Sequence, residues 1–308
     1  MSNAIETSGL RYRAGKSFAI QDVNLHVPEG AVYGFLGPNG AGKTTTMRLL
    51  LGLLRQDAGD IRLLGHPMPQ GYVEALQKVG YVPERPHLYP TFSIHESLAY
   101  HAAFFPTWDE AHARELASRF ELPGDRRLSS LSKGETGKLM MLLALAQRPR
   151  LLALDEPTDG LDPVVRRDVL EALLDYVSSS GATVFISSHL VHELERICDW
   201  IGVMDRGRLI AELPMEEFRA GIKRLRVVTG AQAGEAWKSA PFSVLARHEG
   251  DARGEQWLVR GWKPEMAAAV EAKGVSVREV VDLDLEEGFV ELLRSFRAPA
   301  GESSNGAR

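Results

Sequence analysis

The chain has 308 residues, of which 44% are hydrophobic and 25% charged, and its formal net charge is -5. This composition is typical of a globular protein and excludes a chain that is mainly disordered, collagen-like or coiled-coil. The negative charge argues against binding nucleic acid through bulk positive charge, so no nucleic-acid partner is expected. The length predicts two domains, or one large domain with a smaller addition.

Neither a disulfide, a secretory signal nor a membrane-spanning helix is expected. Cys198 is the single cysteine, and the first residues, MSNAIETSGLRYR, have no apolar signal core. The longest strongly apolar run lies near Leu139–Ala146 and is far shorter than the roughly 20 residues that a spanning helix needs. Any association with a membrane is therefore expected to come through a partner.

Short apolar runs alternate with helical patterns as far as residue 213. In chain order, strands are predicted over Val32–Gly37, Lys78–Pro83, Leu151–Leu154, Thr183–Ser187, Trp200–Asp205 and Arg208–Leu213. Helices are predicted over Thr44–Leu54, Ile94–Leu122 with a break at Pro106, Gly134–Gln147, Pro163–Tyr176 and Val191–Cys198. This alternation predicts an α/β fold with a mainly parallel sheet.

A smaller α/β domain is predicted after a boundary near Phe218–Arg224, over residues 225–297. Its strands are expected over Leu225–Val228, Gln256–Val259 and Val275–Val281, and its helices over Pro264–Lys273 and Leu285–Phe296. The last residues, 298–308, are small and polar and are expected to form a flexible tail.

A phosphate-binding loop is predicted between the first of these strands and its helix. Residues Gly37–Thr44 fit the pattern G-x-x-x-x-G-K-[ST]. Glycines let successive N–H groups converge on phosphates, Lys43 can reach the β- and γ-phosphates, and the Thr44 hydroxyl can ligate Mg²⁺. The alternative, a glycine-rich turn that matches by chance, is disfavoured by the strand before it and the helix after it. The predicted ATP-binding residues are Gly37, Pro38, Asn39, Gly40, Ala41, Gly42, Lys43, Thr44 and Thr45.

Two carboxylates follow the apolar run LLAL. Asp155 can hold Mg²⁺, and Glu156 can polarise the water that attacks the γ-phosphate. A solvated acidic turn is the alternative, and the phosphate loop makes it less favoured. Upstream, Ser132 precedes a long apolar helix with Glu135 three residues later, which is a capping box. A helix N-terminus with a serine hydroxyl is also a good anion site, so both interpretations stand together.

The order of these motifs resembles the nucleotide-binding subunit of an ATP-binding-cassette transporter, over about Ile5 to Leu213. The resemblance implies a P-loop NTPase (RecA-like) core with an antiparallel β-subdomain and an α-helical subdomain at about 85–147, together forming an ATP-binding domain over 1–220. It identifies LLALDEP as Walker B and LSKGE as the family signature.

The resemblance also implies roles for individual residues. The signature residues Ser132, Lys133, Gly134 and Glu135 would act across a dimer. Glu156 and His189 would be catalytic, Thr44, Asp155 and Glu84 would hold Mg²⁺, and Asp162 would belong to the D-loop. Tyr12 would stack on adenine, with Phe18 as a contributor.

Four positions depart from the family pattern. Glu84 replaces a usual Gln, Lys133 and Glu135 replace Gly and Gln of the signature, and Asp159 occupies a place that usually holds a smaller or neutral residue. A carboxylate at Glu84 adds a charge close to Asp155 and predicts a stronger Mg²⁺ or pH dependence than glutamine would give.

The resemblance implies ATP and Mg²⁺ as cofactors, and as partners a second nucleotide-binding subunit, identical or different, and a separate transmembrane permease. The protein would then be cytoplasmic and peripheral on the inner face of the membrane. The segment RPHLYPTFSIHESL after Glu84, with Leu88, Tyr89 and Phe92, is the expected docking surface, although these side chains could instead form the subdomain core. Asp284–Phe289 favours export over import. A cassette ATPase that acts on ribosomes or DNA and a non-catalytic regulator are the alternatives.

Overall fold

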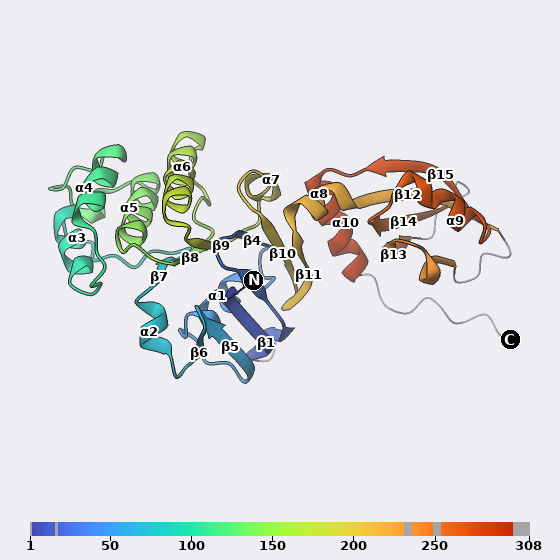
Figure 1. The fold of residues 1–308 in the computed structure, drawn as a ribbon. Helices are drawn as coiled ribbons and strands as arrows, with labels where there is room; N and C mark the ends of the chain where they lie inside the picture. The colour runs from blue at the N-terminus through green and yellow to red at the C-terminus, as the bar shows by residue number, and fades with distance from the viewer. Residues whose placement is uncertain (1, 16–17, 231–235, 249–253, 298–308) are drawn as a thin grey trace. The chain divides into compact units, whose positions relative to one another are not determined.

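The structure is a computed structural model of the 308-residue chain, and it describes residues 2–15, 18–230, 236–248 and 254–297. The chain forms two compact units. The first runs as far as Leu190 and also includes Arg196–Glu212, and the second comprises Val191–Glu195 and continues from Leu213. Figure 1 shows the order of the helices and strands. The tail that was predicted to be flexible, 298–308, lies outside the described residues.

A six-stranded sheet in the order β11-β10-β4-β9-β8-β7 lies at the centre of the first unit. Its strands are β4 (Val32–Leu36), β7 (Val79–Val82), β8 (Leu151–Asp155), β9 (Thr183–Ser188), β10 (Trp200–Asp205) and β11 (Arg208–Pro214). The strands from β10 to β7 are parallel to one another. Every residue of β4, β8 and β9 is buried, which explains their near-continuous apolar sequences. The predicted α/β fold with a mainly parallel sheet is confirmed.

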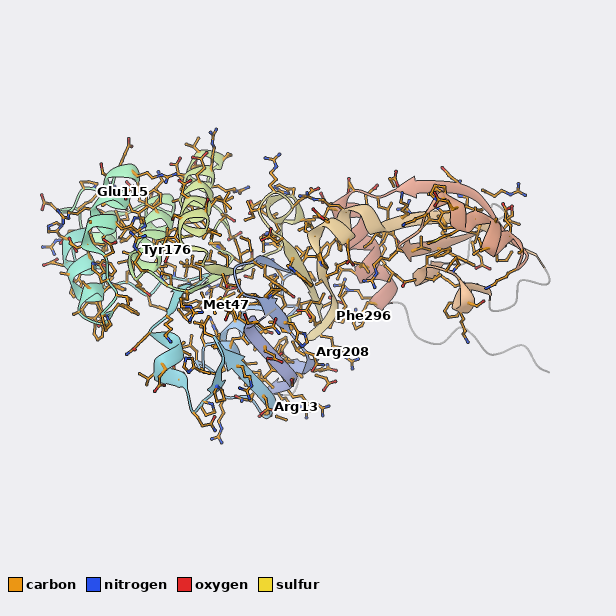
Figure 2. All side chains as sticks on the ribbon, in the orientation of Figure 1. Arg13, Met47, Glu115, Tyr176, Arg208 and Phe296 are labelled. Carbon is orange, nitrogen blue, oxygen red and sulfur yellow. The ribbon has the colours of Figure 1, made fainter. Side chains whose placement is uncertain are left out.

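The antiparallel β-subdomain that the resemblance implied is also present. Its strands are β1 (Asn3–Ala14), β2 (Phe18–Val23), β3 (His26–Pro28), β5 (Ala58–Leu63) and β6 (His66–Met68), in the order β2-β1-β5-β6 with β3 paired to β1. Helix α1 (Lys43–Leu50) shares a hydrophobic core with both sheets. Met47 of this helix, labelled in Figure 2, is fully buried in that core together with Leu10 and Phe35. The core therefore anchors the helix that follows the predicted phosphate loop.

Helix α1 ends at Leu50, before the Leu54 that the apolar pattern indicated. Gly52 has φ = 66°, a left-handed value that ends helices. The N–H groups of Leu53 and Leu54 both donate to the carbonyl of Arg48 and close the helix end. The leucines beyond Leu50 continue the apolar pattern but not the helix.

The helical part of the first unit lies between β7 and β8 in sequence. It contains α3 (Ile94–Ala102), α4 (Glu110–Arg119), the 3-10 turn η1 (Leu128–Ser130) and α5 (Lys133–Ala146). The predicted break at Pro106 is confirmed, because it falls between α3 and α4. The short α2 (Tyr72–Leu76) precedes β7, and α6 (Pro163–Ser180) connects β8 to β9.

The second unit is built on an antiparallel sheet in the order β13-β14-β12-β15. Its elements are α7 (Val191–Leu194), α8 (Met215–Gly221), β12 (Ile222–Thr229), η2 (Ala236–Ser239), β13 (Ser243–His248), β14 (Glu255–Arg260), η3 (Pro264–Met266), α9 (Ala267–Glu271), β15 (Val275–Asp282) and α10 (Leu285–Arg297). Trp257 and Leu225 lie at the centre of its core. The boundary expected near Phe218–Arg224 falls within α8 and the start of β12, and both elements belong to this unit.

The helix predicted over Val191–Cys198 is wrong in extent, since α7 ends at Leu194. The segment between Leu194 and β10 holds Cys198, which is buried. Within the described ranges, no helix has both the length and the apolar character needed to cross a membrane.

Candidate functional site

The loop between β4 and α1 is shaped by its glycines. Gly42, the residue that caps α1, has φ = 113°, which glycine adopts without the steric cost of a side chain. A Cβ on Gly37 would lie 2.4 Å from the carbonyl oxygen of Met204, so only glycine fits there. The loop can therefore lie against β10 and direct the N–H groups at the start of α1 toward the carboxyl edge of the sheet.

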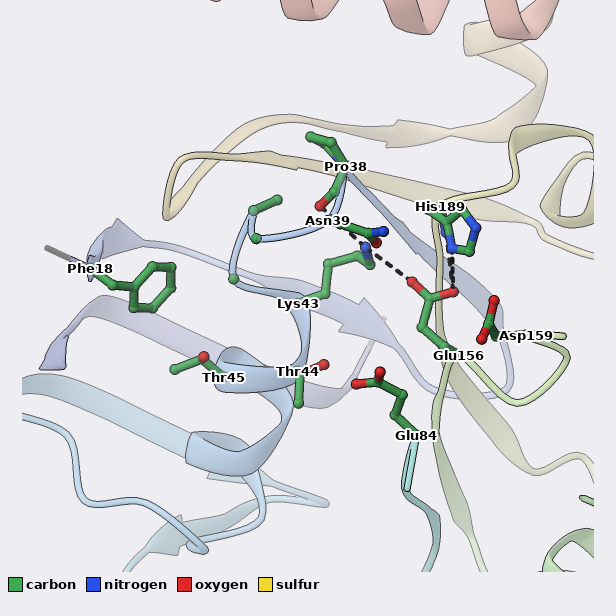
Figure 3. Close-up of a pocket in the computed structure, with 13 residues that line it drawn as sticks. Phe18, Pro38, Asn39, Lys43, Thr44, Thr45, Glu84, Glu156, Asp159 and His189 are labelled. Atoms are coloured by element: carbon green, nitrogen blue, oxygen red, sulfur yellow. Dashed lines mark hydrogen bonds and ion pairs between the residues drawn. The ribbon is translucent and has the colours of Figure 1, made fainter. Parts of the chain in front are cut away.

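A cavity of about 390 Å³ opens against this loop. Its lining residues are Phe18, Pro38, Asn39, Gly40, Ala41, Gly42, Lys43, Thr44, Thr45, Glu84, Glu156, Asp159 and His189. In Figure 3 the side chains of Lys43 and His189 both point toward the carboxylate of Glu156. The structure thus brings the predicted phosphate loop together with both predicted catalytic side chains.

Lys43 is held by two kinds of oxygen. Its side chain is 5% exposed, and its Nζ donates to the carbonyl oxygen of Gly37 at 2.6 Å. The same Nζ lies 3.1 Å from Oε1 of Glu156. A buried ammonium needs such partners, because burial without them is costly. A phosphate oxygen could take the place of the Glu156 carboxylate, since both are anionic acceptors.

The Glu156 carboxylate contacts Lys43 through one oxygen and His189 through the other. Its Oε2 lies 2.9 Å from Nδ1 of His189 and also accepts the His189 backbone N–H at 3.3 Å. Its backbone has φ = 50°, a left-handed conformation that is uncommon for a residue with a side chain. Strained backbone of this kind persists where the surrounding structure determines it. The carboxylate therefore has a defined position between an ammonium and an imidazole.

Asp155 is fully buried at the end of β8. Its Oδ1 accepts the hydroxyl protons of Ser187 at 2.8 Å and Thr44 at 3.1 Å. Its Oδ2 has no hydrogen-bond partner within the described residues. Burial raises the pKa of Asp155; the two hydroxyls lower this pKa, and the negative charges of Glu84 and Glu156 raise it. A cation beside Oδ2 would relieve this desolvation and repulsion.

The oxygens around Asp155 fit Mg²⁺. This ion prefers oxygen ligands and is usually held by one or two carboxylates together with substrate phosphates. Thr44 and Asp155 supply a hydroxyl and an unpartnered carboxylate oxygen, and the Glu84 carboxylate points toward Thr44 in Figure 3. In the part of the chain that the structure describes, no three His, Cys, Asp or Glu side chains are grouped to hold a metal alone. The ion would share its coordination with the phosphates of a nucleotide.

The predicted signature residues lie at the N-terminus of α5. The hydroxyl of Ser132 accepts the Glu135 N–H at 3.2 Å, and the Glu135 carboxylate accepts the Ser132 N–H at 2.9 Å. The predicted capping box is therefore confirmed. Glu135 also forms an ion pair with Arg126, and these hydrogen bonds lower the pKa of Glu135, with the Ser132 N–H making the largest contribution.

Lys133 lies beside the loop that follows Glu156, and Gly134 lies against Val165 of α6. Lys133 Nζ lies 3.4 Å from Oδ2 of Asp159, so two of the departures from the family pattern contact each other. A Cβ on Gly160 would meet Lys133 Nζ at 2.1 Å, which places the lysine side chain directly over that glycine. None of the four signature residues is among the described residues that line the cavity.

Tyr12 and Asp162 are not among the described residues that line the cavity. Tyr12 lies on β1 opposite Ile20 and packs against the hydrophobic core, whereas Phe18 lines the cavity. Asp162 is the N-cap of α6, and its Oδ1 accepts the N–H groups of Val164 at 3.0 Å and Val165 at 3.1 Å. The adenine-stacking role of Tyr12 and the D-loop role of Asp162 stay predictions.

One cavity-supporting residue had no role assigned from sequence. Ser187 contacts both Asp155 and Glu156 through its hydroxyl. The available signal was a serine at the end of the otherwise apolar run TVFIS. The strand pattern alone does not explain why a polar residue should be buried there. Only the register of β8 and β9, which sets Ser187 opposite Asp155, reveals its partners.

Known proteins resemble this chain in sequence and structure. Residues 20–159 match the family model described as ABC transporter. The chain is 38% identical over 215 residues to "Nod factor export ATP-binding protein I" of Paraburkholderia xenovorans (strain LB400), covering 68% of this chain and 70% of that protein. It is 33% identical over 221 residues to "Bacitracin transport ATP-binding protein BcrA" of Bacillus licheniformis, covering 71% and 72%. A solved structure titled "Structure of ATP binding subunit of ABC transporter" matches with a TM-score of 0.63 and 28% identity, over 70% of this chain and 92% of that one.

Proposed function

The chain belongs to the ABC transporter family, as an ATP-binding, ATP-hydrolysing subunit, and from this premise we propose that it drives export through a separate membrane subunit. The observation that carries the proposal is the cavity in which Lys43, Glu156 and His189 meet beside the phosphate loop. The direction is supported by a relative whose name specifies export. The membrane subunit would determine which molecule is exported.

ATP would enter the cavity with its phosphates against the loop. The N–H groups of residues 39–45 and the ammonium of Lys43 would bind the β- and γ-phosphates. Lys43 would exchange the Glu156 carboxylate for a phosphate oxygen, which frees Glu156 to face the γ-phosphate. Bound Mg²⁺, held by Thr44, Asp155 and Glu84, would neutralise phosphate charge.

Hydrolysis would follow from the geometry of Glu156 and His189. The Glu156 carboxylate would accept a hydrogen bond from a water and orient it toward the γ-phosphorus. The water oxygen forms a new bond to phosphorus as its proton passes to the Glu156 carboxylate. The bond from phosphorus to the β–γ bridging oxygen breaks, and that oxygen keeps the electron pair, giving ADP and phosphate. His189 would hold Glu156 in place through its 2.9 Å contact and contact the γ-phosphate.

A second nucleotide-binding subunit, identical or different, would complete the site. Ser132, Lys133, Gly134 and Glu135 would face the γ-phosphate in the partner. The exposure of Ser132 and Lys133 supports this role, because exposed polar groups at a helix N-terminus can bind an anion from another molecule. ATP would then favour the closed dimer, and hydrolysis would release it.

The membrane subunit would dock on the helical part of the first unit and on the groove next to it. A groove of about 490 Å³ is lined mainly by apolar residues of α2, β7 and their neighbours: Leu51, Leu53, Tyr72, Val73, Leu76, Gln77, Val79, Tyr81, His101, Phe105 and Gln147. Beside it lies an aromatic cluster of Tyr89, Phe92, Tyr100 and Phe104, with ring centroids 5.0 to 5.8 Å apart. Tyr89 and Phe104 are 54% and 62% exposed. Exposed apolar patches of this kind mark interaction sites. The protein would thus be peripheral on the cytoplasmic face of the membrane.

Docking can be tested separately from hydrolysis. Phe104→Asp should reduce co-purification of a polytopic membrane protein from detergent-solubilised cells, because a charge in the cluster disfavours burial. ATP hydrolysis by the purified subunit should be unchanged. Val164→Asp, at another exposed apolar residue (70%), is the matched control and should keep the partner. Equal recovery of the partner with both variants would argue against this docking surface.

The catalytic proposal is tested by Glu156→Gln. Glutamine keeps the size of the side chain but cannot act as a base, so ATP turnover should fall at least about 100-fold. ATP should bind at least as tightly as to wild type, because Lys43 no longer has an anionic competitor. Size-exclusion chromatography with ATP should show a trapped dimer. Glu171→Gln on the exposed face of α6 is the control. Wild-type turnover in Glu156→Gln would refute the role of Glu156.

A further inference from the structure

Ser187 is a polar residue in the fully buried strand β9. Its exposure is 0%, and the strand register sets it opposite Phe35 of β4 on one side and Asp155 of β8 on the other. It therefore lies between the strand that leads into the phosphate loop and the strand that carries the two acidic residues. A buried hydroxyl requires hydrogen-bond partners, and those of Ser187 are the buried Asp155 at the end of β8 and Glu156, which lines the cavity.

The Ser187 hydroxyl links the two acidic residues. It donates its proton to Oδ1 of Asp155 at 2.8 Å and accepts the N–H of Glu156 at 3.0 Å. A serine hydroxyl has one proton and two lone pairs, so donation to Asp155 leaves a lone pair for the Glu156 N–H. One side chain thus orients the carboxylate of one residue and the backbone of the next.

The Glu156 backbone depends on this contact. Its φ of 50° lies in the left-handed region, which a residue with a side chain enters only when neighbouring groups determine it. On its far side the Glu156 carbonyl accepts the N–H of Asp159 at 3.1 Å and closes a turn. Ser187 holds the near side. Without it, the backbone can relax and carry the carboxylate away from Lys43 and His189.

We propose that Ser187 is a positioning residue for ATP hydrolysis, because its hydroxyl holds the backbone of Glu156 and one carboxylate oxygen of Asp155 in the catalytic geometry. Ser187 acts through these neighbours and does not contact ATP. The proposal rests on the function proposed above for Glu156. It predicts a loss of turnover with little loss of ATP affinity, because the phosphate loop and Lys43 keep their own contacts.

The chain provides a matched control in the next residue. Ser188 is also buried, with 3% exposure, and also ends β9. Its hydroxyl accepts the N–H of Leu190 at 2.9 Å, away from the carboxylates of Asp155 and Glu156. Loss of the Ser188 hydroxyl therefore removes one partly buried hydrogen bond at the end of the same strand and leaves both hydrogen bonds of Ser187 in place.

The experiment compares four variants of the full chain: Ser187→Ala, Ser187→Thr, Ser187→Cys and Ser188→Ala. Steady-state ATP hydrolysis gives kcat and KM, a fluorescent ATP analogue gives nucleotide affinity, and thermal melting followed by circular dichroism checks folding. Ser187→Ala should lower kcat about 10- to 100-fold, the cost of a catalytic group displaced by about 1 Å, with affinity within about threefold of wild type. Ser187→Thr keeps the hydroxyl and should recover much of the turnover. Ser188→Ala should stay within about twofold of wild type, since it frees no catalytic group.

Three results would overturn the proposal. These are wild-type kcat in Ser187→Ala, an equal loss of kcat in Ser187→Ala and Ser188→Ala, or a parallel loss of kcat and ATP affinity. If Ser187→Ala does not fold, Ser187→Cys decides, because a thiol is a weak hydrogen-bonding group of similar size and full turnover would contradict the role. A failure of the function itself is distinguishable, because wild-type protein would then hydrolyse no ATP.

Discussion

The nucleotide cavity and the signature segment differ in how their charges are satisfied. In the cavity, Lys43 and Glu156 are 5% and 10% exposed and face each other at 3.1 Å. In the signature segment, residues 132–135, Lys133 is 64% exposed, and its ion-pair partner at 3.4 Å is Asp159 of the loop after β8, which is 47% exposed. Removing one partner of a buried pair leaves an uncompensated charge, whereas an exposed pair contributes only about 0–1 kcal/mol. One chain therefore preassembles the cavity, while the signature segment can exchange its contacts for those of another molecule.

Because of this difference, substitutions in the cavity and in the signature segment should have different measurable effects. Changes in the cavity should alter ATP binding by the isolated subunit. Changes in the signature segment should mainly alter turnover and should change that binding by at most about fivefold, because none of its residues lines the cavity within the described residues.

Lys43→Ala should have the largest effect. It removes the cation that would face the phosphates and leaves Glu156 buried without its ion-pair partner. ATP affinity should fall at least about 30-fold, equivalent to about 2 kcal/mol, as measured by titration with a fluorescent ATP analogue. Lys138→Ala is the matched control, since Lys138 is 13% exposed and pairs with Asp168 at 2.7 Å on the helices. An equal loss of affinity in both variants would show that the effect is on folding.

The role of the signature segment can be tested by comparing two serines that cap helices in the same way. Ser132 caps α5 in a capping box with Glu135, and Ser93 caps α3 in the same way with Glu96. Ser132→Ala and Ser93→Ala should each lower the free energy of unfolding by about 1 kcal/mol in urea titrations. Only Ser132→Ala should also lower ATP turnover, by about tenfold or more, because only this hydroxyl would face a partner's phosphate. Nucleotide affinity of the monomer should be unchanged in both. Similar turnover in the two variants would remove Ser132 from the site.

Glu84→Gln tests the extra charge on the cavity side. A carboxylate binds Mg²⁺ more strongly than an amide, so the Mg²⁺ concentration for half-maximal turnover should rise a few-fold, roughly 1 kcal/mol of binding, in the variant. Glu74→Gln on α2, away from the cavity lining, is the control. Superimposable Mg²⁺ titrations for wild type and Glu84→Gln would contradict a role for Glu84 in metal binding.

The same variant should change the pH dependence of stability without nucleotide. Burial raises the pKa of Asp155, and the Glu84 charge adds to this shift. A carboxyl with a raised pKa binds more protons in the folded state, so stability falls as pH rises from the ordinary Asp pKa through the raised one. Glu84→Gln removes one cause, so its melting temperature should fall less over that range. A steeper fall in the variant would reverse the assigned sign.

The residues of the cavity could be predicted from the sequence, whereas the antiparallel strands could not be located in the same way. Gly37–Thr44, Glu156 and His189 follow buried apolar strands, and parallel strands bring their carboxyl ends to one edge, so proximity follows from order alone. Strands such as β1 and β5 lack a continuous apolar run, because their burial is irregular and their register shifts. The contacts of Ser187 depend on strand register, and the Lys133–Asp159 contact depends on how α5 sits beside the loop after β8. Neither follows from local patterns.

Changes to the Lys133–Asp159 pair should have the smallest effect. They test whether the signature segment influences ATP binding in the cavity of its own subunit. Asp159 lines the cavity, so its charge disfavours a nearby γ-phosphate, and Lys133 offsets that charge. Asp159→Asn should therefore raise ATP affinity by up to about fivefold, and Lys133→Ala should lower it by a similar factor, the range of an exposed pair. The double variant should match Asp159→Asn, because Lys133 has nothing left to offset. If the two single effects add instead, Lys133 acts independently of Asp159. If Lys133→Ala leaves affinity unchanged, the signature segment influences ATP only from the partner subunit.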